Sequence, residues 1–247
     1  MTKTGIDLGS RFVKICTENE GKLNFYKYNT IDFYKKYINR DSSGQLKIEH
    51  SLLDNSNSKI TATGYGRNLM TFSNAGVISE IKAHFKGARK QIGLDDFVLI
   101  DIGGQDSKVI KAADGFIDDF IMNDKCAAST GRFLENAANI LRINIDEMAV
   151  YTGNPCKFSS TCAIFSESEI IGKIAEGVST EAISAGVNLS VARRLLPLIK
   201  RFSKNEIYGA GGVVSLYGVR YFLQELLDKE INVLENHQYN AAIGCVE

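Results

Sequence analysis

The sequence has few of the histidines and cysteines that hold zinc in zinc fingers, and it has no excess of positive or negative charge. It contains three histidines and five cysteines, with no C-x-x-C pair, so the usual zinc-finger spacings are absent. Lysine plus arginine and aspartate plus glutamate each number 29, which makes the formal net charge zero. A neutral chain offers no bulk electrostatic attraction to nucleic acid or to an anionic membrane. We therefore expect neither as a partner.

Long apolar runs and proline-rich segments are also missing. No run approaches the roughly 20 apolar residues of a membrane span, and the first predicted strand begins within a few residues of Met1. This pattern predicts no signal peptide, no membrane span and a cytoplasmic protein. Only two prolines occur, so no rigid linker is evident. A length of 247 residues, 44% of them hydrophobic, is typical of a globular chain with one large or two small domains.

The most informative stretch begins with four apolar residues, Phe97–Ile100, which predict a buried strand. Asp101 ends this strand, Gly103 and Gly104 follow, and the chain returns to apolar residues after Lys108. Without a Cβ, the two glycines allow backbone amides to approach a phosphate closely. An acid at the strand end can hold Mg²⁺ or orient a water molecule. The alternative is a hairpin turn that merely needs glycine.

The same pattern recurs elsewhere in the chain. Asp7 ends a short strand near the N-terminus, Gly9 and Ser10 follow, and Val13 lies on the returning strand. A third strand meets the turn 209–212, and a helix is predicted from about Leu216. Three strands that each run into glycine predict two similar half-domains that close on one nucleotide.

The remaining periodicity predicts an alternation of helices and strands. The predicted strands are 4–8, 12–18, 23–28, 59–63, 115–122 and 231–233, and the predicted helices include 31–38, 46–57, 76–93, 177–202 and 216–229. Cys126 and Cys162 both lie among small or hydroxyl residues just before a predicted helix, where backbone amides favour a thiolate.

These two cysteines cannot complete a metal site alone, because zinc and iron–sulfur clusters need about four ligands. Cys156 is a possible third ligand, six residues before Cys162. Two interpretations therefore stay open on spacing alone. Either the cysteines are ordinary buried thiols, or a symmetric dimer supplies two from each subunit.

Taken together, the motifs resemble the activator ATPases of 2-hydroxyacyl-CoA dehydratases and benzoyl-CoA reductases. The resemblance runs in order along nearly the whole chain and rests on Asp7-Leu8-Gly9-Ser10, Asp101–Lys108, Asn123–Ala128, Cys162–Glu169 and Gly211-Gly212-Val213, with 63–67 and 79–84 in support. The departures are Arg11-Phe12 at a turn that usually has small residues, Ser129 in place of glycine, and a poor match over 29–57.

The resemblance implies an α/β, actin-like, two-lobed ATPase with duplicated ribonuclease-H-like half-domains. We expect residues 1–94 with 235–247 to form the first lobe and residues 95–234 the second. The family pattern implies catalytic roles for Asp7, Asp101 and Gln105. It implies contacts with ATP, ADP and Mg²⁺ by Gly9, Ser10, Arg11, Phe12, Val13, Lys14, Gly103, Gly104, Asp106, Gly211 and Gly212.

The resemblance also implies a homodimer with one [4Fe–4S] cluster, held by Cys126 and Cys162 of each chain. ATP hydrolysis would drive an electron from a ferredoxin or flavodoxin donor into a dehydratase or reductase partner. Two rival functions remain on the glycine motifs alone: a small-molecule kinase of the same fold, and a cluster-free nucleotide sensor. A phosphorylated metabolite would favour the first, and bound but unhydrolysed ATP without iron would favour the second.

Overall fold

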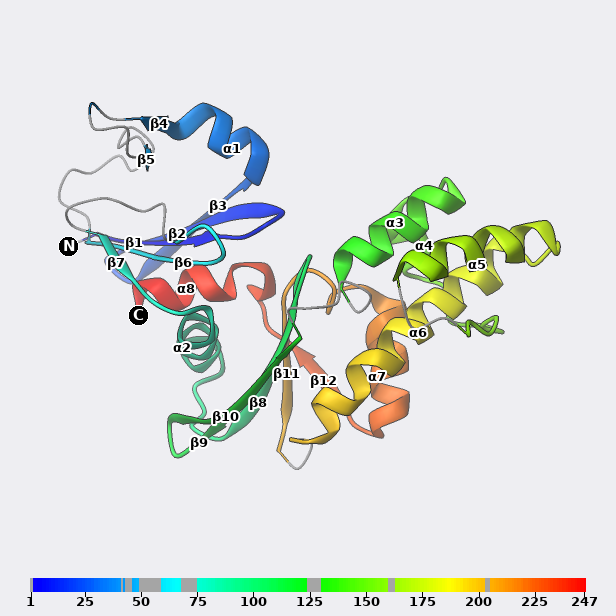
Figure 1. Cartoon of the computed structure of the whole chain (residues 1–247). Coiled ribbons are helices and arrows are strands. Elements are labelled where there is room, and N and C mark those ends of the chain that lie inside the picture. Colours follow the sequence, from blue (N-terminus) through cyan, green and yellow to red (C-terminus); the bar gives the residue numbers. More distant parts are fainter. Residues whose placement is uncertain are drawn as a thin grey trace. The chain divides into compact units, whose positions relative to one another are not determined.

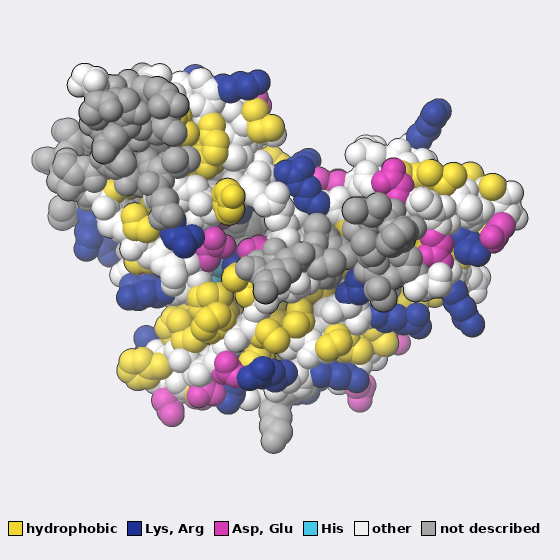
Figure 2. All heavy atoms as spheres, in the orientation of Figure 1, with side chains coloured by type: hydrophobic (Ala, Val, Ile, Leu, Met, Phe, Trp, Pro, Cys, Tyr) yellow, Lys and Arg dark blue, Asp and Glu magenta, His cyan; other side chains and the backbone are white. Residues whose placement is uncertain are grey.

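The computed structural model describes residues 2–40, 42, 46–48, 59–67, 75–123, 130–159, 163–202 and 205–247 (Figure 1). The chain divides into two compact units, Met1–Leu94 with Leu234–Glu247 (unit 1) and Asp95–Val233 (unit 2). On the face drawn in Figure 2, basic and acidic side chains are interspersed, in keeping with the zero net charge.

Unit 1 is built on a five-stranded sheet with helices on both faces. The strand order is β3 (Lys22–Asn29), β2 (Phe12–Asn19), β1 (Lys3–Leu8), β6 (Lys59–Thr63) and β7 (Ala75–Val77). The first three strands are antiparallel, and β6 and β7 continue parallel to β1. Helix α1 (Thr30–Tyr37) buries Phe33 against one face, and α8 (Asn240–Val246) packs on the other, beside α2 (Glu80–Ile92).

Unit 2 repeats this sheet. Its strand order is β10 (Phe116–Asn123), β9 (Ser107–Ala113), β8 (Phe97–Ile102), β11 (Ile207–Ala210) and β12 (Ile231–Val233). The helices are α3 (Gly131–Leu141), α4 (Ile145–Met148), α5 (Ala163–Ala175), α6 (Thr180–Lys200) and α7 (Tyr217–Leu227). One core joins the apolar residues of β8, β9 and β11 to α3, α6 and α7.

The two sheets correspond strand for strand. In each, two antiparallel hairpins come first, and the central strand then pairs in parallel with a strand from much later in its unit. Asp7 lies opposite Lys14 in the first sheet, and Asp101 lies opposite Lys108 in the second. This topology confirms the duplicated half-domains that the repeated glycine motif predicts.

Two predicted segments differ from the structure, and a third segment had no predicted structure. Residues 46–57 were expected to be helical, but Leu46–Ile48 form strand β5, which pairs antiparallel with β4 (Ile38–Arg40), and 49–58 lie outside the described residues. Helix α2 starts later than the expected residue 76, because Ser79 accepts a hydrogen bond from the Lys82 amide and caps it there. The small residues near the C-terminus, whose structure the sequence left open, form helix α8.

Helix α6 is long and apolar enough to cross a membrane, although no such span was expected from the sequence. Within unit 2, however, it is a core helix. Ile183, Val187, Val191 and Leu195 are fully or almost fully buried, and the helix packs against α7 and α3. Length and hydropathy alone therefore do not distinguish it from the central helix of a globular domain.

Helices α2 and α8 pack unusually closely. A Cβ at Gly87 would overlap the Asn240 carbonyl oxygen, and one at Gly244 would overlap the Ala83 carbonyl oxygen. The contact also has a polar centre, because Asn240 Nδ2 donates to the His84 carbonyl at 2.9 Å while its Oδ1 accepts from Gln91 Nε2 at 2.9 Å. These contacts fix α8 on the sheet of unit 1.

We expect Gly244→Ala to destabilise unit 1, because the added methyl group would force apart the backbones of α2 and α8. The free energy of unfolding should fall by about 2–3 kcal/mol. The matched control is Gly172→Ala in α5, where an added Cβ meets nothing within 4 Å. That change should leave stability unchanged or raise it by up to about 1 kcal/mol. Thermal unfolding of both variants tests this, and equal melting temperatures would contradict it.

Candidate functional site

The first glycine hairpin connects β1 to β2 and carries a buried acid. Asp7 is 7% exposed, and its Oδ2 lies 2.8 Å from Lys14 Nζ. The pair arises directly from the strand register, which places Lys14 opposite Asp7 on the same face of the sheet. A charged carboxylate buried at a strand end is costly unless paired, and Lys14 provides the pairing.

A second lysine lies beside this pair. Lys27 of β3 is directly opposite Lys14, and its Nζ lies 4.1 Å from the centroid of the Phe12 ring. Arg11 Cζ lies 5.5 Å from the same centroid. Partial burial, followed by the nearby Lys14 and Arg11 charges, lowers the pKa of Lys27 below its ordinary value. Like charges placed opposite each other destabilise a sheet, so this arrangement favours an anionic ligand.

The carbonyl groups of this hairpin are held by the start of α1. Thr30 Oγ1 donates to the Gly9 carbonyl at 2.8 Å, and the Thr30 amide donates to the Arg11 carbonyl at 3.1 Å. On the other side, Gly64 follows β6 with a φ of 94°, and its Cα lies against the backbone of Leu8. A side chain at Gly64 would clash there, so glycine is required.

The second hairpin connects β8 to β9 and has a different charge. Lys108, 3% exposed, places its Nζ 2.8 Å from Asp106 Oδ2 and 3.6 Å from Asp101 Oδ2. Asp101 is 4% exposed, and the Gly103 amide closes the turn on the Asp106 carbonyl at 2.9 Å. One lysine therefore pairs with two carboxylates here, whereas at the first hairpin Asp7 pairs with Lys14, and Arg11 and Lys27 lie at the neighbouring Phe12 ring.

The third glycine motif lies at the end of β11, beside the end of β8. Ala210 pairs with Asp101, and Gly211 follows with a φ of 86°, where an added Cβ would overlap the Ile102 carbonyl oxygen. The Val213 amide then donates to the Ile102 carbonyl at 3.2 Å. Unit 2 thus brings two of the three predicted glycine motifs to one edge of its sheet.

The predicted site residues differ in how far they are exposed to solvent. Gln105 and Gly212 are exposed, whereas Gly9, Ser10, Gly103 and Gly104 are half-buried. The Val13 side chain is fully buried in the core of unit 1, which leaves only its backbone for ligand contacts.

Sequence reasoning assigned no role to Lys27, Thr30 or Lys108, which the structure places at the hairpins. The seven-residue spacing between Asp and Lys, the same in both hairpins, was a usable signal for Lys108. Lys27 could have been found by counting the register of the β2–β3 pair, which places it opposite Lys14.

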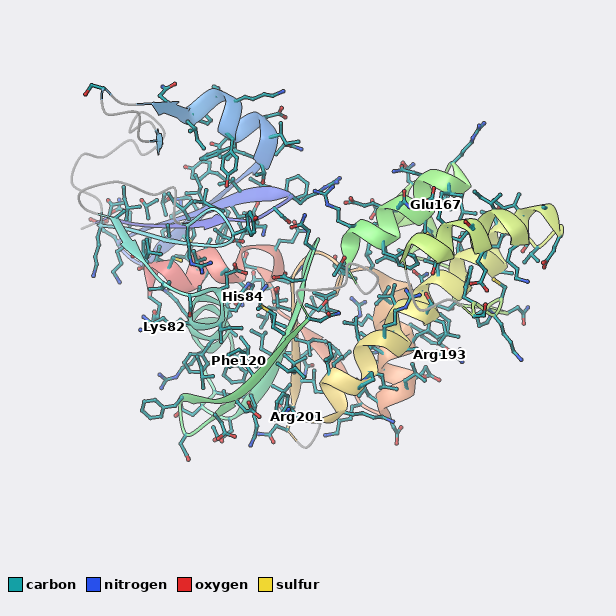
Figure 3. The ribbon with its side chains drawn as sticks, viewed as in Figure 1. Lys82, His84, Phe120, Glu167, Arg193 and Arg201 are labelled. Carbon is teal, nitrogen blue, oxygen red and sulfur yellow. The ribbon has the colours of Figure 1, made fainter. Side chains whose placement is uncertain are left out.

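The predicted cluster ligands Cys126 and Cys162 lie outside the described residues. The helices that follow them, α3 and α5, pack together, and Asn136 Nδ2 donates to Glu167 Oε2 at 3.2 Å (Figure 3). Among the described residues, no group of three or more His, Cys, Asp or Glu side chains is suited to hold a metal ion.

The other three cysteines are free thiols. Burial raises the pKa of Cys16 to about 12 and also raises that of Cys245, so both favour the inert protonated form. Half-buried Cys156 packs beside Gly186, and its pKa is raised by the same cause.

Similar proteins are known over the full length of the chain. It is 37% identical to the (R)-2-hydroxyglutaryl-CoA dehydratase activating ATPase of Acidaminococcus fermentans, over 98% of this chain and 94% of that protein. The solved structure of the activator of the 2-hydroxyisocaproyl-CoA dehydratase from Clostridium difficile, with bound ADPNP, matches with a TM-score of 0.85 at 30% identity, covering 100% of this chain and 93% of that one.

A more distant structure establishes the fold class. MreB 5 of Spiroplasma citri, bound to AMPPNP, matches 98% of this chain and 94% of its own with a TM-score of 0.56 at 13% identity. At that identity the likeness concerns the fold alone, and it confirms the predicted two-lobed actin-like architecture. The model of the BadF/BadG/BcrA/BcrD ATPase family matches residues 46–247. Since that model spans most of the chain and a full-length relative is more than one-third identical, the chain belongs to the BadF/BadG/BcrA/BcrD ATPase family.

Proposed function

We propose that this protein is an ATP-dependent activator that delivers a low-potential electron to a 2-hydroxyacyl-CoA dehydratase or a related reductase. The observation that carries the proposal is full-length similarity to dehydratase activators, combined with two Asp–Lys glycine hairpins at matching places in the two sheets. The electron donor would be a ferredoxin or flavodoxin, and the protein would act in the cytoplasm as a homodimer.

The first hairpin would bind the phosphates of ATP or ADP. Arg11, Lys14 and Lys27 carry three positive charges there, against the single negative charge of Asp7. A solved relative carries ADPNP, whose phosphate groups are anionic. Binding a phosphate would relieve the repulsion between Lys14 and Lys27 and would raise the lowered pKa of Lys27.

The second hairpin would organise the hydrolytic chemistry. Carboxylate oxygens are the ligands that Mg²⁺ prefers, and Asp101 and Asp106 of this hairpin would supply them, as Asp7 would at the first hairpin. A bound Mg²⁺ would neutralise phosphate charge. Buried Lys108 holds Asp106, and Gln105 is exposed at the turn, where it would orient the attacking water. Gly211 and Gly212 would border the adenosine. Catalysis would come mainly from positioning and charge neutralisation, as in other phosphoryl transfers.

Cys126 and Cys162 of two chains would hold one [4Fe–4S] cluster, which would supply one-electron redox chemistry. The packing of α3 against α5 supports this assignment, because the two helices begin shortly after the two cysteines in the sequence. Among the residues that the structure describes, no other group of three or more His, Cys, Asp or Glu side chains is suited to hold a metal ion, which supports a site shared between subunits.

The role of Asp101 can be tested by Asp101→Asn, which keeps the side chain's size and removes its charge. We expect nucleotide binding to persist and kcat for ATP hydrolysis to fall at least about 100-fold. Phosphate release and calorimetry measure the two quantities. Asp118→Asn is the matched control, since Asp118 is an exposed acid of β10 in a surface ion pair with Lys111. Undiminished turnover in Asp101→Asn would reject the assigned role.

Lys27→Met tests the phosphate side of the site. Loss of one charge-assisted contact should weaken ATP binding about tenfold and flatten its dependence on salt. Lys22→Met removes an exposed lysine from the other end of β3 and should change neither the affinity for ATP nor its dependence on salt. Equal ATP affinities of Lys27→Met and the native chain at low salt would contradict the charge argument.

Cys126→Ala tests the cluster ligands. After anaerobic purification, we expect the native chain to be a dimer with about four irons and the variant to have lost them. Iron and sulfide analysis with native mass spectrometry gives both numbers. Cys156→Ala is the control and should keep its iron. If Cys126→Ala keeps the iron, the ligand assignment is wrong, and if Cys156→Ala loses it, Cys156 is a ligand.

A further inference from the structure

The first two amides of helix α3 are capped by another part of unit 2. The Gly131 amide donates to the Gly103 carbonyl and the Arg132 amide donates to the Gly104 carbonyl, each at 3.0 Å. Thr130, the N-cap residue, makes no side-chain hydrogen bond to the helix amides. Helix-terminal amides ordinarily receive such a cap from a nearby side chain or from water. Here the glycine hairpin supplies it.

This contact fixes the direction of two peptide groups in the hairpin. In a planar trans peptide, the C=O and the following N–H point in opposite directions. Since the Gly103 and Gly104 carbonyls point at α3, the amide hydrogens of Gly104 and Gln105 point away from it. Those hydrogens are the donors that a phosphate would need at this turn.

We propose that the Gly131 and Arg132 amides are positioning groups, which orient the Gly104 and Gln105 amides toward the nucleotide phosphates and thereby link nucleotide binding to the stability of the first turn of α3. The inference rests on the proposed function, because it takes the second hairpin as a phosphate-binding turn. A phosphate on these amides polarises the peptide groups and strengthens their hydrogen bonds to α3. The coupling is reciprocal: the factor by which a bound nucleotide stabilises the first turn of α3 equals the factor by which the ordered turn strengthens nucleotide binding.

Unit 1 provides an internal reference. There the Thr30 amide and hydroxyl also bind the hairpin carbonyls of Arg11 and Gly9. However, Asn29 Oδ1 caps α1 by accepting hydrogen bonds from the Ile31 and Asp32 amides at 2.9 and 3.4 Å. The first turn of α1 therefore has a local cap that does not depend on its hairpin. Linkage to the nucleotide should be much stronger at α3 than at α1.

Two substitutions at Gly131 compare a residue that lacks the N–H with one that keeps it. Gly131→Pro removes the N–H at the first helical position, where proline is well tolerated, and Thr130 already has the extended backbone, with φ −130° and ψ 173°, that proline requires before it. Gly131→Ala keeps the N–H and adds a similar Cβ, which would lie 3.3 Å from Val213 Cγ2 and 3.4 Å from the Gly103 oxygen. The difference between the two variants therefore measures the loss of the N–H together with the contact of the proline Cδ with the Gly103 oxygen, which lies 3.0 Å from the Gly131 nitrogen in the native chain.

We expect Gly131→Pro to bind a non-hydrolysable ATP analogue about fivefold more weakly than Gly131→Ala, which is the equivalent of one net hydrogen bond. Adenosine, which lacks phosphates, should compete equally well in both, whereas a general loss of structure would weaken adenosine as well. Hydrogen exchange of the native chain should slow at residues 132–135 when the analogue binds, with a smaller change at 31–34.

Each result bears on the inference. Equal analogue affinities in the two variants would overturn it and leave the proposed function intact. If Gly131→Pro does not fold, the native exchange experiment decides alone, and exchange at 132–135 that ignores the nucleotide would overturn the linkage. If the native chain binds no nucleotide at all, the proposed function fails as well.

Discussion

Each glycine hairpin in this protein is held by the N-terminus of the helix that follows the third strand of its own sheet. Thr30 binds the carbonyls of the first hairpin, and the Gly131 and Arg132 amides bind those of the second. Short glycine turns have many accessible conformations, and ordering them costs conformational entropy. By occupying the carbonyl side, the helix leaves the amide side of each turn for a ligand. The remaining features of both hairpins build on this arrangement.

The two hairpins have the same strand register but opposite net charge, positive at the first and negative at the second. The same register produces an Asp–Lys pair in each, but the residues around the pairs differ: the first gains Arg11 and Lys27, and the second gains Asp106. A cationic turn suits phosphate, and an acidic turn suits a magnesium ion with its water.

The local sequence predicted the strand-borne acids and the glycine turns, because each depends on residues that are adjacent in the chain. It did not reveal the role of Lys27, which depends on strand register, or of Gly131, which meets Gly103 only through the fold of unit 2. Residues 46–48 were expected to be helical and are instead a strand, since pairing with β4 overrides local propensity. The assignment of Cys126 and Cys162 rested on family resemblance and stays a prediction.

The central claim is that ATP hydrolysis by this chain drives an electron into a partner enzyme. The most direct measurement mixes the reduced, anaerobic protein with a purified 2-hydroxyacyl-CoA dehydratase and follows oxidation of the protein by its visible absorbance. The account predicts rapid oxidation with ATP and Mg²⁺, and none with a non-hydrolysable analogue. Equal oxidation with both nucleotides, or ATP hydrolysis without any oxidation, would contradict it.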